Sequence, residues 1–253
     1  MTMEPIAPPK SYYSEGLLEE FISETRKKLE QEPLNHHLRC SLANALAKNG
    51  QLDLAVEEYK KCIEQSPTQE YINNLGKALL NSGRYQEAVA AFEKVIEICN
   101  WPDAYFNLAQ SHRSLGDLEM ASKMLEKAIE INPKYREALN ERAHILEALN
   151  RKDEALKDYK KVIALFFAEY QAHDAEVYNY EMSVLFDNPE LVEELIRQLR
   201  KYIQKFPGFA DGYYKLGQAL EAKGLKTEAM LMFRKALEIN PSYETARKCF
   251  WKR

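Results

Sequence analysis

The sequence predicts an all-α solenoid, which is a stack of antiparallel helix hairpins. One pattern of apolar and small residues occurs at Ala104–Pro133 and again at Gly212–Pro241, and the turn glycines of the two copies, Gly116 and Gly224, lie 108 residues apart. Between turn residues, paired segments of about 12–16 residues carry apolar residues three and four positions apart, as amphipathic helices do. No run of β-branched or aromatic residues alternates with polar ones, so no strand is predicted.

The repeat has a period of 33 or 34 residues and contains one insertion. Its units start at His36, Gln69, Pro102, Arg136, Glu176 and Ala210. The steps between these starts are 33, 33, 34, 40 and 34 residues, which places six extra residues around Phe166–Ala175. No proline or glycine interrupts Arg151 to Asn188, so we expect the insertion to lengthen one or both helices there.

The repeats and their flanks divide the chain into six segments, because each hairpin must stack on a neighbour to bury its apolar face. The expected segments are a flexible N-terminal arm (1–14), an N-terminal capping helix (15–35), units one to four (36–169), an irregular junction with a degenerate fifth unit (170–209), unit six (210–243) and a C-terminal capping helix (244–253). The fifth unit departs most, with Glu190 at its turn and Leu195 where other units carry alanine. There we expect helices at Glu176–Phe186 and Pro189–Lys205, the second capped by Asn188.

Glycine marks the turn between the two helices of most units. The turn glycines are Gly50, Gly83, Gly116 and Gly224. We expect a left-handed backbone there, because glycine adopts it without the ~1–2 kcal/mol that it costs other residues. Asn150, the next most tolerant residue type, replaces glycine in the fourth unit.

Four other positions recur in register. The seventh residue of a unit is apolar in Leu42, Leu75, Leu108, Met182 and Leu216. The eighth is small in Ala43, Gly76, Ala109, Ala143, Ser183 and Gly217. The twentieth is alanine in Ala55, Ala88, Ala121, Ala155 and Ala229, and an aromatic residue follows four later in Tyr59, Phe92, Tyr159 and Phe233. From Leu34 to about Tyr243 these residues resemble the tetratricopeptide repeat family, which implies a right-handed superhelix of about six hairpins.

Composition and motifs exclude several classes of function. A net charge of -4 argues against nucleic acid as the main partner, and no apolar run approaches the ~20 residues of a membrane span. The N-terminus has no apolar core, so it is not a secretory signal, and four scattered cysteines without a C-x-x-C pair indicate reduced thiols in a cytoplasmic protein. No metal, cofactor or catalytic motif is recognisable, so we expect neither a cofactor nor enzyme activity.

The resemblance implies a concave groove lined by the first helix of each hairpin, through its second, fifth, sixth, ninth and twelfth positions. In the early units the candidate groove residues are Asn44, Asn73, Asn74, Lys77, Phe106, Asn107, Gln110 and Arg113. Amides suit an extended peptide, since they offer donors and acceptors to its main chain. Asn74 and Asn107 occupy equivalent positions, so we expect them to form a short ladder. The alternative, that these amides only meet water, stays open.

The later units are acidic at groove positions. The fourth unit contributes Glu137, Asn140, Glu141 and His144, and further carboxylates follow at Glu147, Glu181, Asp187, Asp211 and Glu221. This arrangement favours a protein partner with basic residues, although a solvated acidic face remains an alternative. Family members that grip the acidic carboxyl terminus of heat-shock chaperones need basic residues where this chain has Cys40, Asp103 and Asn107, so we exclude that role.

Two other features have structural and functional interpretations. His112 and Arg142 stand where most units are apolar, and we expect each to be half-buried beside a polar partner such as a glutamate. The aromatic residues Phe166, Phe167, Tyr170 and Tyr178 either fill space at the irregular junction or form a patch that pairs two copies.

Taken together, these patterns favour a non-catalytic adaptor or scaffold that binds a partner peptide or helix in the groove. The alternatives are a self-assembling structural scaffold and a regulatory segment of a longer multidomain protein.

Overall fold

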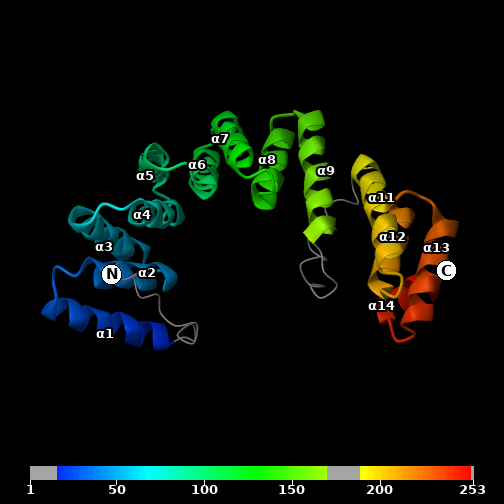
Figure 1. Ribbon diagram of the computed structural model, residues 1–253, viewed down its shortest axis with the longest axis horizontal. Helices are drawn as coiled ribbons and strands as arrows, with labels where there is room; N and C mark the ends of the chain where they lie inside the picture. The colour runs from blue at the N-terminus through cyan, green and yellow to red at the C-terminus, as the bar shows by residue number, and fades with distance from the viewer. Residues whose placement is uncertain (1–15, 170–188, 252–253) are drawn as a thin grey trace. The chain divides into compact units, whose positions relative to one another are not determined.

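A computed structural model describes residues 16–169 and 189–251 of the chain (Figure 1). Every regular element in these two ranges is an α-helix, and within residues 17–131 and 189–251 each helix contacts the one that follows it, so the predicted all-α solenoid class is confirmed. The helices fall into two compact units, residues 1–138 and 139–253.

The first unit is a succession of hairpins. Its helices are α1 (Leu17–Gln31), α2 (His36–Lys48), α3 (Leu52–Gln65), α4 (Gln69–Asn81), α5 (Tyr85–Ile98), α6 (Pro102–Ser114) and α7 (Leu118–Ile131). Helix α1 packs on α2, and the pairs α2–α3, α4–α5 and α6–α7 form hairpins that stack through α3–α4 and α5–α6 contacts. The first helices also touch one another, α2 with α4 and α4 with α6, so their residues share one continuous surface.

Helix α8 (Arg136–Ala148) begins in the first unit and continues into the second, which also holds α9 (Lys152–Glu169), α11 (Pro189–Lys205), α12 (Ala210–Ala222), α13 (Lys226–Ile239) and α14 (Glu244–Trp251). Helix α11 has the predicted bounds, whereas the helix predicted at Glu176–Phe186 lies outside the described residues. Helix α9 has 18 residues, against 14 in each of α3, α5, α7 and α13. The prediction that the insertion lengthens a helix is therefore confirmed.

Apolar side chains from both helices of each hairpin form the cores. Leu46, Val56, Phe92 and Val95 are fully buried in the first unit. In the second unit, Leu195, Leu199, Leu216 and Phe233 are equally inaccessible. Full burial of one such side chain contributes about 1.5–3 kcal/mol, which is why stacking stabilises helices that carry only one apolar face.

The turns have the expected backbone. Gly50, Gly83, Gly116 and Gly224 have φ values of 75°, 79°, 83° and 82°. Asn150 has φ 60° and is the only described non-glycine residue with positive φ. The sequence therefore places the chain reversals correctly in these five hairpins.

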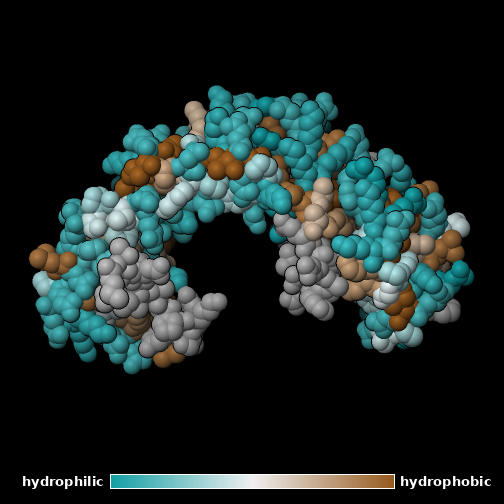
Figure 2. All heavy atoms as spheres, viewed as in Figure 1, coloured by the Kyte–Doolittle hydropathy of each residue, from teal (hydrophilic) through white to brown (hydrophobic). Residues whose placement is uncertain are grey.

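Polar residues cover most of the helix faces visible in Figure 2, and apolar residues appear between them as small patches. Among the described helices, none combines the length and the apolar character that crossing a membrane requires.

Candidate functional site

The candidate site is the surface formed by the groove positions of α2, α4 and α6, which we call the amide surface. It comprises Asn44, Asn73, Asn74, Lys77, Phe106, Asn107, Gln110 and Arg113. Residues three and four apart lie on one face of a helix, and α4 contacts both α2 and α6, so these side chains belong to adjoining parts of one surface. Lys77 and Arg113 are exposed, whereas Phe106 and Gln110 are half-buried.

A hydrogen-bonded amide pair joins α2 to α4. The Asn74 Nδ2 donates to Asn44 Oδ1 at 3.4 Å, and the hydroxyl of Tyr59 on α3 donates to the same oxygen at 2.5 Å. Both asparagines are half-buried. Tyr59 therefore fixes the orientation of the Asn44 amide, and the Asn44 amide in turn orients Asn74.

The structure contains a different amide pair from the expected ladder of Asn74 and Asn107. Within the two described ranges, no hydrogen bond joins these two side chains, and Asn74 bonds to Asn44 instead. The reason is geometric: the sixth residue of one first helix faces the ninth residue of the preceding one, because the contacting helices cross at an angle. Equivalent positions alone did not identify the bonded pair.

Two amides of this surface hold buried polar atoms without partners. Asn73 is 8% exposed and Asn107 is 9% exposed. Among the described residues, neither Asn73 Oδ1 nor Asn107 Nδ2 has a hydrogen-bond partner. A buried polar group left unpaired costs about 1–3 kcal/mol, so these atoms are candidates for pairing with a bound ligand.

An aromatic and acidic cluster lies beside Asn107 on α6. The Phe106 ring centroid is 5.3 Å from that of Tyr135, and the Tyr135 hydroxyl donates to Asp103 Oδ1 at 2.6 Å. Burial and then the Asp103 carboxylate raise the pKa of Tyr135, so the phenol stays neutral and keeps its donor. In the last hairpin, Tyr243 and Asp211 form the same kind of bond.

The groove positions of the fourth hairpin are mostly exposed. Glu137, Asn140 and His144 are exposed, and Glu141 is half-buried. The Tyr159 hydroxyl on α9 lies 2.9 Å from His144 Nδ1 and 2.9 Å from Glu147 Oε2. Burial and the Glu147 carboxylate raise the pKa of Tyr159. The expected preference for basic ligands remains a prediction, and Glu181 and Asp187 lie outside the described residues.

Sequence reasoning missed the tyrosine hydroxyls as parts of the site. Tyr59 and Tyr159 occupy the same repeat position and each bonds to the ninth residue of the first helix in its own hairpin, Asn44 or His144. At this repeat position the first and fourth units carry tyrosine and two others carry Phe92 and Phe233, so only the tyrosine hydroxyl itself could have indicated a polar contact. Only the role of this position in core packing was recognised.

The two polar residues at apolar positions have polar partners, as expected, although the partners are aspartates. Both Nε and Nη2 of Arg142 donate to Asp158, at 2.6 and 2.8 Å, in a buried bidentate pair that ties α8 to α9. His112 lies 3.8 Å from Asp117 at the α6–α7 turn. These contacts hold hairpins together, and neither forms part of the amide surface.

At the junction, Phe166 is 7% exposed and belongs to the core of the second unit. Phe167 is half-buried and packs against the same core. Tyr170 and Tyr178 lie outside the described residues, so self-association through this segment stays a prediction.

Comparison with known proteins identifies the repeat. Family models described as tetratricopeptide repeat match residues 68–134, residues 36–69 and 210–243, and residues 106–166. Together the matches cover well over half of the chain. No curated protein sequence matches it.

Several solved structures share the fold. MamA 41-end from Desulfovibrio magneticus RS-1 is 19% identical with a TM-score of 0.59, over 64% of this chain and 92% of that chain. A further MamA crystal structure is 22% identical with a TM-score of 0.50, over 83% of this chain and 94% of that one. The APC/C hetero-tetramer Cut9-Hcn1 is 13% identical with a TM-score of 0.55, over 96% of this chain and 47% of that one. At these identities the similarity concerns the fold alone.

Proposed function

The chain belongs to the tetratricopeptide repeat family, and on that premise we propose that it is a non-catalytic adaptor that holds a segment of a partner protein against its amide surface. The observation that carries the proposal is the pair of buried, unpartnered amide atoms, Asn73 Oδ1 and Asn107 Nδ2. One is an acceptor and the other a donor, as the main chain of an extended peptide requires.

The neighbouring groups support binding of a main chain. Tyr59 holds the Asn44 amide, which contacts Asn74, so part of the surface is already ordered before a ligand arrives. An ordered site loses less conformational entropy on binding. The Phe106 and Tyr135 rings offer an apolar contact for a ligand side chain beside Asn107.

Charge supplies a second element of the proposed specificity. Glu137 is an exposed carboxylate at a groove position within the same compact unit as the amide surface, and it favours a segment with basic side chains. Such charges act mainly on the association rate and are screened by salt, so we expect modest affinity that falls as ionic strength rises.

A random peptide display library selected on the full chain tests this proposal. Basic peptides enriched on the wild type should bind the Asn74→Ala/Asn107→Ala double variant about thirtyfold more weakly, if each of the two lost hydrogen bonds contributes ~1 kcal/mol. The Asn81→Ala/Asn100→Ala variant, which removes two exposed amides elsewhere in the first unit, should keep them. Equal enrichment on all three baits would contradict the proposal.

A further inference from the structure

A second surface lies between α9 and α11, which are second helices and carry no residue of the amide surface. It is a slot of about 240 Å³. We call it the aromatic slot, and its lining residues are Ala164, Phe167, Ala168, Gln198, Lys201, Tyr202, Lys205 and Phe206. All of them lie in the second compact unit.

The insertion in the repeat creates this slot. Residues 166–169 extend α9 beyond the 14-residue length of α3, α5, α7 and α13, and Phe167 and Ala168 belong to this extra turn. In a hairpin of standard length the slot would have no such wall. The insertion adds no repeat unit, but it produces one wall of the aromatic slot.

The wall and floor of the slot are aromatic. The Tyr202 ring centroid is 6.0 Å from that of Phe167 and 5.0 Å from that of Phe206. On the α9 side, Ala164 and Ala168 are exposed and one helical turn apart. Their small side chains take up little of the slot volume on this side.

The rim of the slot is positively charged. Arg197, Lys201 and Lys205 follow one another at intervals of four residues on α11, so they form a row on one helix face. The Lys205 ammonium lies over the Phe206 ring, 5.2 Å from its centroid. Lys201 is exposed and forms no ion pair with any residue in the described ranges. Like charges at this spacing destabilise a helix, so helix stability does not account for the row.

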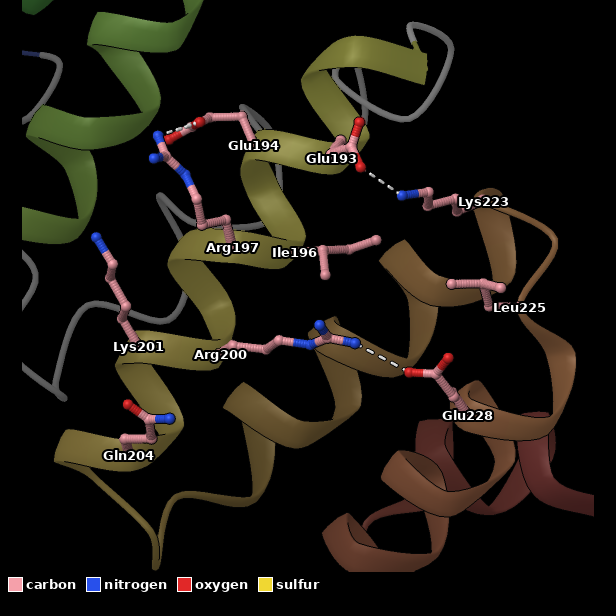
Figure 3. Close-up of a pocket in the computed structure, with 10 residues that line it drawn as sticks. All are labelled: Glu193, Glu194, Ile196, Arg197, Arg200, Lys201, Gln204, Lys223, Leu225 and Glu228. Atoms are coloured by element: carbon pink, nitrogen blue, oxygen red, sulfur yellow. Dashed lines mark hydrogen bonds and ion pairs between the residues drawn. The ribbon is translucent and has the colours of Figure 1, made fainter.

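On α11, the described carboxylates Glu193 and Glu194 are engaged in ion pairs. Arg197 pairs with Glu194, which is nine-tenths buried and also accepts from Gln198 Nε2 at 2.7 Å. Figure 3 shows the other ion pairs on the opposite side of α11, in a neighbouring cleft of about 550 Å³ whose lining also includes Glu194, Arg197 and Lys201. There Lys223 binds Glu193 at 2.7 Å and Arg200 binds Glu228 at 2.9 Å.

Arg197 and Lys201 extend from α11 on the side away from those ion pairs (Figure 3). Lys201 lines both the cleft and the slot, so its ammonium is available at the edge that the two share. Among the described residues that line the slot, the charged ones are Lys201 and Lys205, and both are positive.

We propose that the aromatic slot docks an acidic segment of a partner protein, in which carboxylates flank one large apolar side chain. The apolar side chain fills the space between Phe167 and Phe206, and the carboxylates pair with Lys201 and Lys205. Burial of the apolar group provides affinity, and the lysines select the acidic flanks. This ligand is opposite in charge to the one proposed for the amide surface, so the adaptor would hold two different segments.

Selection of the same peptide library on slot variants tests this inference. The Lys201→Glu/Lys205→Glu variant reverses the rim charge, and its first new carboxylate lies four residues after Arg197, where an opposite charge favours the helix. The Ala168→Trp variant fills the slot from an exposed position. The matched control is Lys94→Glu/Lys123→Glu, which makes the same charge change at exposed lysines on α5 and α7.

Wild type and control should enrich peptides that combine Asp or Glu with Phe, Trp or Leu, and both slot variants should bind them about tenfold more weakly or worse. These peptides should still bind the Asn74→Ala/Asn107→Ala variant, which separates this inference from the proposed function. The inference is overturned if no acidic peptide depends on the slot residues. It is equally overturned if the Lys201 dependence appears only with phosphatidylserine vesicles, because a membrane surface would then be the ligand.

Discussion

At the scale of single residues, two helical positions accept only glycine because aromatic rings pack directly on them. A Cβ added at Gly76 would lie 2.7 Å from Phe92 Cε1, and one added at Gly217 would lie 2.5 Å from Phe233 Cε1. Both rings are fully buried and cannot move without disturbing the core. The glycines therefore allow close approach of the two helices in their hairpins.

The Gly76→Ala and Gly217→Ala variants should each lower the free energy of unfolding by about 1–3 kcal/mol through overpacking. Chemical denaturation monitored by circular dichroism measures the change. Gly208→Ala is the control, because no atom lies within 4 Å of a Cβ added there. Equal effects at all three positions would show that contact with the rings is not the reason for glycine at Gly76 and Gly217.

The tyrosine hydroxyls of the first and fourth hairpins link the core to the polar surface. Tyr59 is buried and reaches Asn44, while Tyr159 reaches His144. Phenylalanine at either position would fill the same space without holding the polar group. The candidate site thus depends on residues that a reading of apolar periodicity assigns to the core.

Replacing Asn107 should weaken peptide binding without lowering the stability of the fold. Its Nδ2 is buried without a partner in the described part of the chain, so the Asn107→Ala variant should lose no hydrogen bond. We expect its free energy of unfolding to stay within about 0.5 kcal/mol of the wild type or to rise. Its affinity for peptides selected on the amide surface should fall about fivefold to tenfold.

Thermal and chemical unfolding, together with fluorescence anisotropy of a labelled selected peptide, give the two readouts. A variant destabilised by several kcal/mol would indicate that Asn107 serves the fold. Unchanged affinity would indicate that its amide does not meet the ligand.

At the scale of helices, the buried Arg142–Asp158 pair fixes α8 against α9. Asp158 has a side chain that is 2% exposed, so removing Arg142 leaves an uncompensated buried charge. The Arg142→Leu variant should lose about 3–5 kcal/mol of stability. The double variant Arg142→Leu/Asp158→Leu should lose far less, because apolar side chains replace both charges.

A double-mutant cycle on urea unfolding compares these variants with Asp158→Leu alone. Additive losses would show that the two residues act independently, contrary to the bidentate geometry.

Helix positions and turns were predictable from the sequence because local chemistry determines them. The start of α11 at Pro189 followed from the Asn188–Pro189 start signal, and the positive φ of Asn150 followed from its place between two amphipathic segments. The added length of α9 followed from the absence of any breaking residue. What the added turn does could not be predicted, because the aromatic slot depends on packing against α11.

At the scale of the whole molecule, repeat spacing predicted the family and the fold class but only part of the candidate site. It correctly grouped the residues of α2, α4 and α6 on adjoining helices. It did not identify Asn44 as the partner of Asn74, since the bonded pair depends on how one helix crosses the next. It also gave no sign that Asn73 and Asn107 bury unpaired atoms, because burial is a tertiary property.

Two surfaces of opposite preference give the molecule its proposed role as an adaptor. The amide surface favours a main chain with basic side chains, and the aromatic slot favours an acidic segment. Because the amide surface lies on first helices and the slot on second helices, ligands of the two surfaces should not compete directly. Selected peptides of the two classes should therefore bind together, each with the affinity that it shows alone.

The most direct test of the central claim is affinity capture from native lysate read by mass spectrometry. Wild type, the Asn74→Ala/Asn107→Ala variant and the Asn81→Ala/Asn100→Ala control serve as baits. The account predicts a partner protein that is recovered with the wild type and the control and lost with the Asn74→Ala/Asn107→Ala variant. Recovery of the same proteins by all three baits would contradict the amide surface as the binding site.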